Sequence, residues 1–288
     1  MDQNKLRRET LDPREPFSFS QASLQDYTDC ARRFQLRYLK RLSWPAAQAE
    51  PVQENERHIR RGDRFHRLAQ QALLGIPLER LAEIAAADPD PELASWWDNF
   101  TGLLPTLQTG ERHVELQLSA PLERHRLLAQ FDLVQIFPDE KRVIVWDWKT
   151  SLKRPKRTWL EGRLQTIIYP YLLARAGAWL NGGQPISAEQ IEMVYWFTGF
   201  PHDPEHIAST PASCKHAEKT LTALVKEIEG LKAEEFEKTP DEKACRFCVY
   251  RSLCERGTSA GILAESTDAD QPTIDIEIDF DQIGEISF

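Results

Sequence analysis

The fold of this 288-residue chain is decided by the stretch Val143-Ile144-Val145-Trp146-Asp147-Trp148-Lys149-Thr150. It is rich in β-branched and aromatic residues, so it predicts a strand over 142–149. The alternating pattern of 126–137 predicts a second strand directly before it. The four residues between them, Pro-Asp-Glu-Lys, are few enough to close an antiparallel hairpin.

This hairpin would bring two acidic side chains together. With a turn centred between Asp139 and Glu140, Asp132 faces Asp147 across the strands, with Cβ atoms about 5 Å apart. Lys149 shares their face, because successive residues of a strand point to opposite sides of the sheet. A one-residue error in the turn would separate the three side chains.

Two carboxylates this close repel each other, and a divalent cation is the simplest way to neutralise both. Carboxylate oxygens favour Mg²⁺ or Mn²⁺. On a phosphodiester, such a cation would polarise the phosphoryl oxygen and help to deprotonate a water, while Lys149 would orient that water or stabilise the developing charge. The alternative is an exposed hairpin with outward-pointing acids, which a bare Asp-x-Lys tripeptide would favour.

The rest of the chain predicts one α/β core around these strands. Ser23 is expected to cap a helix that carries Cys30 in its first turns. A helix at 57–75 would carry His66 on its apolar face, where a lone histidine is more often a core residue than a ligand. The other expected elements are a helical insertion at 76–110, strands at 112–119 and 189–198, and helices at 158–180, interrupted or started by Pro170, and at 213–235.

Four of the five cysteines are split between the two ends of the chain. Cys245, Cys248 and Cys254 lie close together, whereas Cys30 precedes them by most of the chain. The sequence shows neither a secretory signal nor a membrane span, so we expect a cytoplasmic protein whose reduced thiols bind a metal. Structural zinc usually takes cysteines in two close pairs, and this spacing therefore favours an iron–sulfur cluster over zinc.

Charge is distributed unevenly. The net charge is −9, but residues 258–288 contain eight Asp or Glu and no Lys or Arg, and without them the chain carries −1. This acidic tail is typical of a disordered segment, although its alternating Ile and acidic residues would also suit a strand added to a partner protein. Basic residues that could line a DNA phosphate track, or form solvated helix faces, are Arg64, Arg67, Lys153, Arg154, Lys156 and Arg157.

In chain order these residues resemble the PD-(D/E)XK nuclease superfamily, and specifically its RecB-type branch with an iron–sulfur cluster, which includes the AddB nuclease domain and CRISPR-associated exonucleases. The matching motifs are Ser23-Leu24-x-x-Tyr27-x-x-Cys30, Gly62-Asp-Arg-Phe-His66, Gln130-Phe-Asp132, Asp147-Trp-Lys149-Thr150, Gln165-Thr-Ile-Ile-Tyr169 and Cys245-x2-Cys248-x5-Cys254. The resemblance implies a restriction-endonuclease-like core, in which helices flank a central mixed sheet and a cluster staples the two ends.

The resemblance also implies residue roles. The implied ligands of Mg²⁺ or Mn²⁺ are His66, Asp132, Asp147 and the backbone carbonyl of Trp148. The implied catalytic residues are Asp132, Asp147, Lys149, Gln165 and Tyr169, and the implied [4Fe-4S] ligands are Cys30, Cys245, Cys248 and Cys254. The chain departs from the family pattern where Ala129-Gln130 replaces the usual Gly-Arg pair, and where Pro170 enters a helix normally free of proline.

The leading hypothesis is a metal-dependent DNA exonuclease, acting in repair, recombination or defence. The alternative is a non-catalytic DNA-binding or scaffold member of the same fold, in a recombination or CRISPR-adaptation complex. RNA is not excluded as a substrate by any residue. The expected organisation is a flexible N-terminus at 1–16, a nuclease domain at 17–257 and the acidic tail at 258–288, through which a protein partner could bind.

Overall fold

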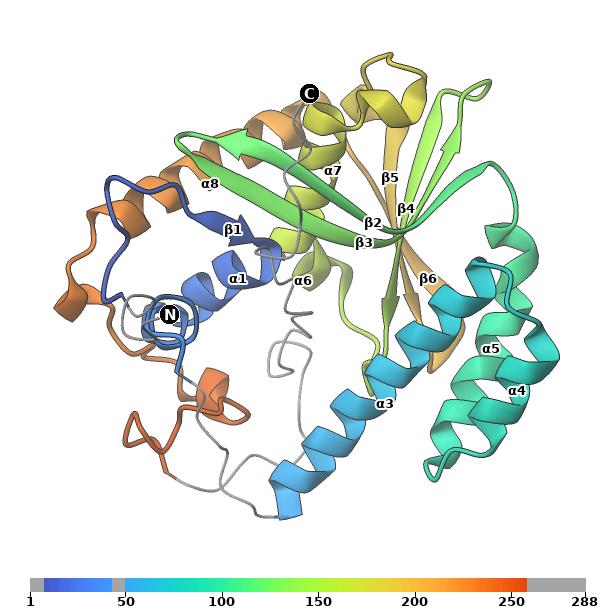
Figure 1. Cartoon of the computed structure of the whole chain (residues 1–288), viewed down its shortest axis with the longest axis horizontal. Helices are drawn as coiled ribbons and strands as arrows, with labels where there is room; N and C mark the ends of the chain where they lie inside the picture. The colour runs from blue at the N-terminus through green and yellow to red at the C-terminus, as the bar shows by residue number, and fades with distance from the viewer. Residues whose placement is uncertain (1–7, 43–49, 258–288) are drawn as a thin grey trace, which may run out of the picture.

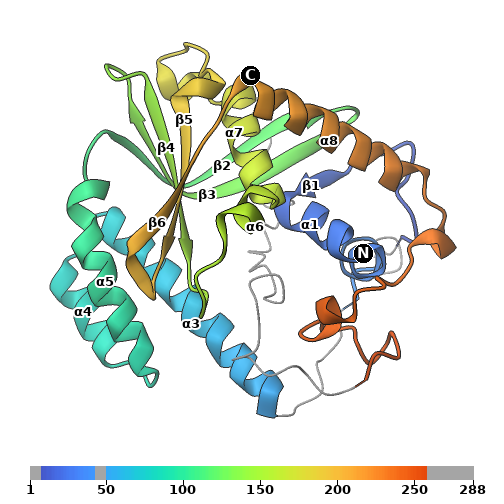
Figure 2. The ribbon, with the colours of Figure 1, turned by 180° about the vertical axis from the view of Figure 1, so that it is seen from behind.

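The computed structural model describes residues 8–42 and 50–257, with side chains from residue 56 onward in the second range. A six-stranded mixed sheet lies between two groups of helices (Figures 1 and 2). The strands are β1 (Ser18–Ser20), β2 (Glu111–Leu122), β3 (His125–Phe137), β4 (Arg142–Lys149), β5 (Ile191–Phe197) and β6 (Phe200–Ala208). The chain is therefore an α/β protein with a central sheet, as predicted.

The predicted hairpin forms in the predicted register. β3 and β4 pair antiparallel from Leu133 opposite Trp146 to Phe137 opposite Arg142. The connecting loop closes with a hydrogen bond from the Lys141 N–H to the Pro138 carbonyl, at 3.1 Å. One step beyond the ladder, this register places Asp132 across from Asp147, so the turn was located correctly from the sequence.

Strands β3 and β4 part at these two aspartates. β2 occupies one edge of β3 along almost its whole length. On the other edge, β1 pairs in parallel with residues 126–128, whereas β4 pairs only from Leu133 onward. Among the described strands none covers residues 129–132 on that edge. The sheet thus opens into a fork, which we define by Asp132 on one side and Asp147 on the other.

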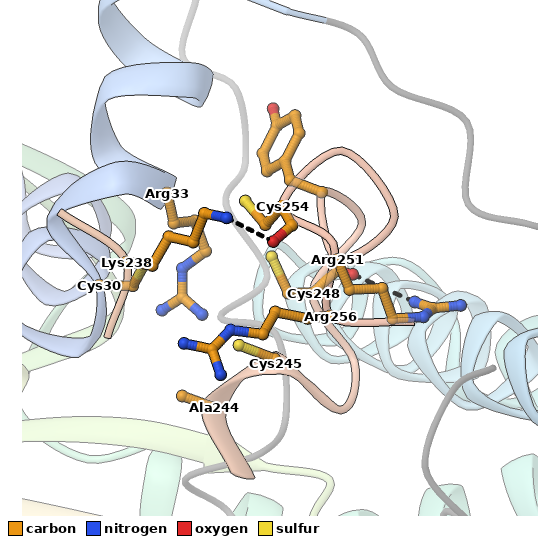
Figure 3. A pocket seen from close by; sticks show the side chains of 10 residues that line it. Cys30, Arg33, Lys238, Ala244, Cys245, Cys248, Arg251, Cys254 and Arg256 are labelled. Carbon is orange, nitrogen blue, oxygen red and sulfur yellow. Dashed lines mark hydrogen bonds between the residues drawn. The ribbon is translucent and has the colours of Figure 1, made fainter. Parts of the chain in front are cut away.

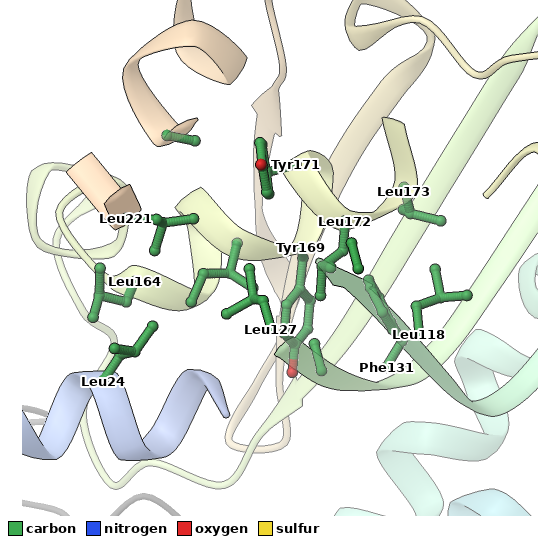
Figure 4. Close-up of a cluster of buried hydrophobic side chains, with 14 of the residues drawn as sticks. Leu24, Leu118, Leu127, Phe131, Leu164, Tyr169, Tyr171, Leu172, Leu173 and Leu221 are labelled. Atoms are coloured by element: carbon green, nitrogen blue, oxygen red, sulfur yellow. The ribbon is translucent and has the colours of Figure 1, made fainter. Parts of the chain in front are cut away.

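The first face of the sheet is covered by α1 (Gln21–Asp29), α7 (Leu164–Ala176) and α8 (Pro211–Gly230). Leu24, Leu172 and Leu221, one from each helix, are fully buried against sheet residues such as Leu127 and Phe131 (Figure 4). α7 crosses this face directly behind the fork, and its polar side chains can therefore reach the aspartates.

The second face is covered by α3 (Glu50–Leu73), α4 (Leu78–Ala86) and α5 (Pro91–Leu107), so the segment 76–110 is helical as predicted. Asp90 caps α5 by accepting from the Glu92 N–H, and Pro91 takes the first helical position, where no backbone donor is needed. This face is largely aromatic. Its buried rings are Phe65, Trp96, Trp97, Phe100, Trp146, Trp148 and Trp196.

Two expected helices differ from the structure. Ser20, and not Ser23, caps α1, because the two serines form a reciprocal capping box. Cys30 then ends α1 in an extended conformation instead of lying inside a helix. The expected helix at 158–180 is divided into α6 (Arg157–Glu161) and α7, and Pro170 neither starts nor ends α7 but lies within it.

Strands β1 and β6 were not predicted from the sequence. The remaining helical elements are short. The short helices are α2 (Ala31–Phe34), the π-helix Gln35–Leu39, and the 3₁₀ turns Ala178–Asn181, Ala188–Gln190, Ala233–Glu235 and Glu242–Cys245. Part of the N-terminus expected to be flexible packs on the core, since Leu11 is buried and the Arg8 N–H donates to the Leu39 carbonyl. The acidic tail lies outside the described residues. Across those that are described, no helix has the length and apolar character needed to cross a membrane.

Candidate functional site

The acid pair and the lysine meet at the fork. The Lys149 Nζ lies 2.7 Å from Asp147 Oδ2. The Asp147 side chain is only 6% exposed, whereas that of Lys149 is 31% exposed. A buried carboxylate therefore holds an ammonium group that still reaches the surface, where a substrate phosphate could meet it.

Two side chains of α7 complete a hydrogen-bonded chain. Lys149 Nζ donates to Gln165 Oε1 at 2.7 Å, and Gln165 Nε2 donates both to Asp147 Oδ1 and to the Tyr169 hydroxyl. Tyr169 in turn donates to the Gln130 carbonyl at 2.6 Å. Gln165 and Tyr169 lie one helical turn apart, so both point to the fork from the same helix face, in contact with the residues predicted to act with them.

His66 reaches the fork from the opposite side of the sheet. Its Nδ1 lies 3.3 Å from Asp132 Oδ1, and Asp132 Oδ2 accepts a hydrogen bond from the Trp148 N–H at 2.7 Å. Phe65, the preceding residue, is fully buried in the aromatic face and anchors this turn of α3. His66 and Asp132, which the resemblance implies as ligands of one cation, therefore lie side by side.

The protonation equilibria of these groups are coupled. Burial raises the pKa of Asp147, and Asp132 raises it further, against the lowering effect of Lys149. Burial lowers the pKa of His66, but Asp132, together with Asp147 and Glu115, more than offsets this, and the pKa lies above its ordinary value. Burial also raises the pKa of Tyr169 well above its usual range, so the phenol keeps the proton that it donates to Gln130.

Glu115 is a third carboxylate near the fork, and the sequence analysis missed it. Burial and the nearby Asp132 raise the pKa of Glu115 to about 7, and its Oε2 accepts a hydrogen bond from Gln130 Nε2. In the sequence, Glu115 is one of several polar residues that alternate with apolar residues in the predicted strand 112–119. Extending the pairing of β2 and β3 from the turn at Glu123 would have placed it opposite Asp132.

The donor set at the fork fits a hard divalent cation. It combines carboxylate oxygens with an imidazole, and the buried Asp147 Oδ2 forms an ion pair with the Lys149 ammonium group without a further hydrogen bond. Within the described ranges, no three His, Cys, Asp or Glu side chains converge closely enough to form a preassembled metal cage. The aspartates are instead satisfied by Trp148, Lys149 and Gln165.

The four predicted cysteines line one pocket, although they come from both ends of the chain (Figure 3). Cys30, Cys245, Cys248 and Cys254 are all half-buried free thiols. Burial raises the pKa of Cys248 to about 11, and it also raises the pKa of Cys254. This donor chemistry fits a metal centre, because binding a metal would replace those protons and relieve the cost of burying thiolates.

Cationic side chains surround the cysteine pocket. Arg33, Lys238, Arg251 and Arg256 line it together with the thiols. Lys238 donates to the Cys254 carbonyl at 2.7 Å, and Arg251 donates to the Cys248 carbonyl at 3.1 Å. Ion pairs compensate much of this positive charge, since Arg33 pairs with Asp26 and Asp29, Lys238 with Glu255, and Arg256 with Glu242.

Direct contacts also join the two ends of the chain. The Arg32 N–H donates to the Glu237 carbonyl at 3.0 Å, and Gln35 Nε2 donates to the Ala233 carbonyl at 2.8 Å. Tyr250 donates to the Leu42 carbonyl at 2.7 Å. The cysteines are thus brought together by a packed interface and do not rely on a metal alone.

Half of the predicted DNA-contact residues form ion pairs. Arg64 pairs with Asp88, Arg154 with Asp203 and Glu205, and Arg157 with Glu161 and Glu205. Asp203 and Glu205 lie on β6, one of the two strands that were not predicted from the sequence. Arg67, Lys153 and Lys156 form no ion pair with another described residue, so their charge is the least compensated of the set.

The mixed sheet with helices on both faces defines a protein with a restriction-endonuclease-like core. The model of the PD-(D/E)XK nuclease superfamily matches residues 18–255, and the chain belongs to this superfamily. No curated protein matches the chain in sequence.

The solved structures that are similar to the chain include the following two. One is SSO0001, with a TM-score of 0.41 and 12% identity, over 84% of this chain and 87% of that chain. The other is a candidate exonuclease from Eubacterium rectale, with a TM-score of 0.44 and 8% identity, over 73% of this chain and 79% of that chain.

Proposed function

We propose that the chain is a divalent-cation-dependent DNA exonuclease. The observation that carries the proposal is the convergence at the fork: Lys149 is held by Asp147 and Gln165, while Asp132 is held beside His66. Membership of a nuclease superfamily supports phosphodiester hydrolysis in general. The choice of exonuclease, and of the RecB-type branch, follows from the resemblance of the motifs that include His66.

Each side chain has a role in this proposal. His66, Asp132, Asp147 and the Trp148 carbonyl would hold Mg²⁺ or Mn²⁺. When bound, the cation polarises the phosphoryl oxygen and lowers the pKa of a coordinated water. Lys149 stabilises negative charge that develops on the phosphate, because its ammonium group is fixed in direction by two hydrogen-bond partners.

Substrate binding is proposed to use the basic residues whose charge is not neutralised by ion pairs. Arg67 follows His66 on α3, and Lys153 and Lys156 follow β4, so both groups lie close in sequence to the site. Arg64, Arg154 and Arg157 would contribute less, since nearby acids already compensate them. Neutralising Lys153 and Lys156 together should weaken DNA binding and reduce its salt dependence.

Assays on end-labelled single- and double-stranded DNA with Mg²⁺, Mn²⁺ or EDTA test the proposed activity. The parent should degrade DNA only with a cation, and Asp147→Asn and Lys149→Ala should each lower the rate by at least about 100-fold, as for other charge-stabilising groups in active sites. Asp139→Asn, on the exposed loop of the same hairpin, is the control and should leave the rate unchanged. Equal rates in all variants would refute the site. End binding without degradation would favour the scaffold alternative.

The cysteine pocket is proposed to hold a [4Fe-4S] cluster with a structural role. Cys30→Ser should abolish the visible absorption and the bound iron and sulfide, and should lower the melting temperature, because the two chain ends lose one of the links between them. Cys214→Ser is the matched control, since Cys214 lies outside the pocket. A colourless parent protein with one bound zinc would contradict the assignment.

A further inference from the structure

The hairpin of β5 and β6 ends beside Lys149. β4 and β5 pair in parallel, with Lys149 opposite Phe197, so their carboxyl ends lie on the same edge of the sheet (Figure 2). Phe197 in turn lies opposite Phe200, the first residue of β6. Two strand spacings therefore separate the backbones of Lys149 and Phe200, which is about 10 Å. A DNA strand whose phosphate contacts Lys149 can bring one of its bases to Phe200.

Part of the Phe200 side chain is open to solvent. Phe200 is the one exposed phenylalanine among the described residues, with 36% of its surface accessible. The turn residue before it, Gly199, has no atom within 4 Å of the position that a Cβ would occupy. The tip of the hairpin is therefore not covered by any other described part of the chain, and a ligand has room beside the ring.

A second exposed apolar side chain, Leu152, lies on the loop next to this hairpin. At the start of the loop, the Thr198 N–H donates to the Lys149 carbonyl at 2.9 Å. Further along, the Arg154 side chain donates to the Asp203 carbonyl at 3.0 Å. Leu152 lies between these two contacts in the chain, so it is held alongside the hairpin, and it is 36% exposed. One exposed apolar side chain is ordinary, whereas two beside a candidate active site indicate a ligand surface.

The charges around this apolar pair suit a DNA strand. Lys153 and Lys156 follow on the same loop, and their charge is not compensated by ion pairs with described residues. The acids of β6 that face the loop, Asp203 and Glu205, are already paired with Arg154. Sites for single-stranded DNA combine a positively charged track for the backbone with aromatic rings on which bases stack. The loop and the hairpin together supply both.

We propose that Phe200, together with Leu152, forms a stacking site for a nucleobase of single-stranded DNA bound at the fork. The inference rests on the proposed function, because it takes Lys149 as the group that contacts a neighbouring phosphate. Stacking accepts any of the four bases, since each presents an aromatic face. It requires an unpaired base close to that phosphate, so the site favours a single strand over an intact duplex.

Binding of short labelled single strands to the full-length chain, without a divalent cation, tests the inference. Phe200→Ala should weaken binding by roughly 5- to 150-fold, the range for losing one base stacked on an aromatic ring. Replacing each nucleotide in turn by an abasic one should reveal a position at which the parent loses affinity to a similar extent. At that position Phe200→Ala should lose no further affinity, and Phe200→Trp should behave like the parent throughout.

The abasic strands separate stacking from a role in the fold. If Phe200→Ala weakens the binding of intact strands and of every abasic strand by the same factor, then Phe200 acts through the structure of the hairpin and the inference is overturned. Should Phe200→Ala misfold, Phe200→Leu gives the same comparison, because leucine keeps most of the apolar volume without the ring.

Trp179→Ala is the matched control. Trp179 is also an exposed aromatic residue, 60% accessible, and its ring packs edge-on against His113. It follows the end of α7, however, whereas Gln165 lies at the start of that helix, beside the fork. Affinity for single strands should be unchanged in this variant. A loss equal to that of Phe200→Ala would show that exposed rings contribute wherever they lie, and would contradict a specific stacking site.

Nuclease assays distinguish the inference from the proposed function. On single-stranded DNA, Phe200→Ala should raise KM and leave kcat unchanged, whereas Asp147→Asn should lower kcat. If Phe200→Ala keeps the parental affinity and KM while Asp147→Asn is inactive, the stacking site is refuted and the proposed site stands. If Asp147→Asn degrades DNA at the parental rate, the proposed function fails, and the stacking site fails with it because the strand is not held at Lys149.

Discussion

At the scale of single residues, His58 is the most unusual titratable group outside the fork. It is 4% exposed, and its Nδ1 accepts a hydrogen bond from Arg61 at 2.8 Å. Arg61 is anchored by Asp90 and lies 4.5 Å above the Trp96 ring. Burial, reinforced by the Arg61 charge, lowers the pKa of His58 to about 4.

This shift makes the stability of the protein depend on pH. The unfolded chain takes up the proton near pH 6.5 and the folded chain only near pH 4, so the contribution of His58 is complete above pH 6.5 and is lost as the pH falls toward 4. His58→Asn keeps an acceptor for Arg61 and cannot be protonated. Urea unfolding between pH 6.5 and 4 should show that this variant loses less stability than the parent, by roughly 3 kcal/mol.

His202→Asn serves as the control for this measurement, because His202 is exposed. Its stability should follow the parental pH dependence. If His58→Asn loses as much stability as the parent between pH 6.5 and 4, then His58 does not titrate with a lowered pKa.

At the scale of elements, α3 contributes neighbouring residues to the aromatic face and to the fork. Phe65 is fully buried and contacts the rings of Trp96, Phe100 and Trp196, while the next residue, His66, lies beside Asp132. We therefore expect the packing of Phe65 to help hold His66 in place.

Phe65→Ala should cost about 3–5 kcal/mol of unfolding free energy, the usual range for a buried ring, and should lower nuclease activity even at temperatures where the variant stays folded. Denaturant titration combined with the nuclease assay measures both effects. Leu74→Ala, at an exposed position just after the same helix, should change stability by less than about 0.5 kcal/mol. Full activity in a folded Phe65→Ala protein would show that His66 is positioned by other contacts.

Elements with strong local signals could be predicted from the sequence. The β3–β4 register followed from a short loop and from the alternation that separates Trp146 from Asp147. β1 and β6 were missed because β1 has three residues and β6 contains two prolines, which argue against a central strand. The apolar face of α3 was predicted only in part: Ala69 and Leu73 lie in the core as expected, whereas Phe65 and not His66 packs against Trp196.

The candidate site was predictable where each residue belonged to a motif. Asp132, Asp147, Lys149, Gln165 and Tyr169 lie together as expected, because one hairpin and one helix turn bring them there. The ion pairs of Arg154 and Arg157 with Asp203 and Glu205 could not be foreseen, since these two acids come from the distant strand β6. The left-handed backbone of Glu115, with a φ of 51°, is not indicated by any feature of the residue pattern.

At the scale of the whole molecule, the acidic tail is expected to compete with DNA for the basic residues near the fork. Deleting residues 258–288 should raise the rate of DNA degradation, most visibly at low salt, where charges on the surface are screened least. A tail of equal length with its eight acids changed to Asn or Gln should act like the deletion. If both proteins degrade DNA at the parental rate, the tail has no inhibitory role.

The asymmetry between the two faces of the sheet gives the protein a built-in optical probe. Five of its eight tryptophans belong to the aromatic face, so intrinsic fluorescence follows mainly the unfolding of that half. Circular dichroism averages over both halves, including the helices that pack near the cysteines. Coincident transitions by the two signals would mean that the halves melt as one unit, and a gap between them would show that the fork can come apart while one layer survives.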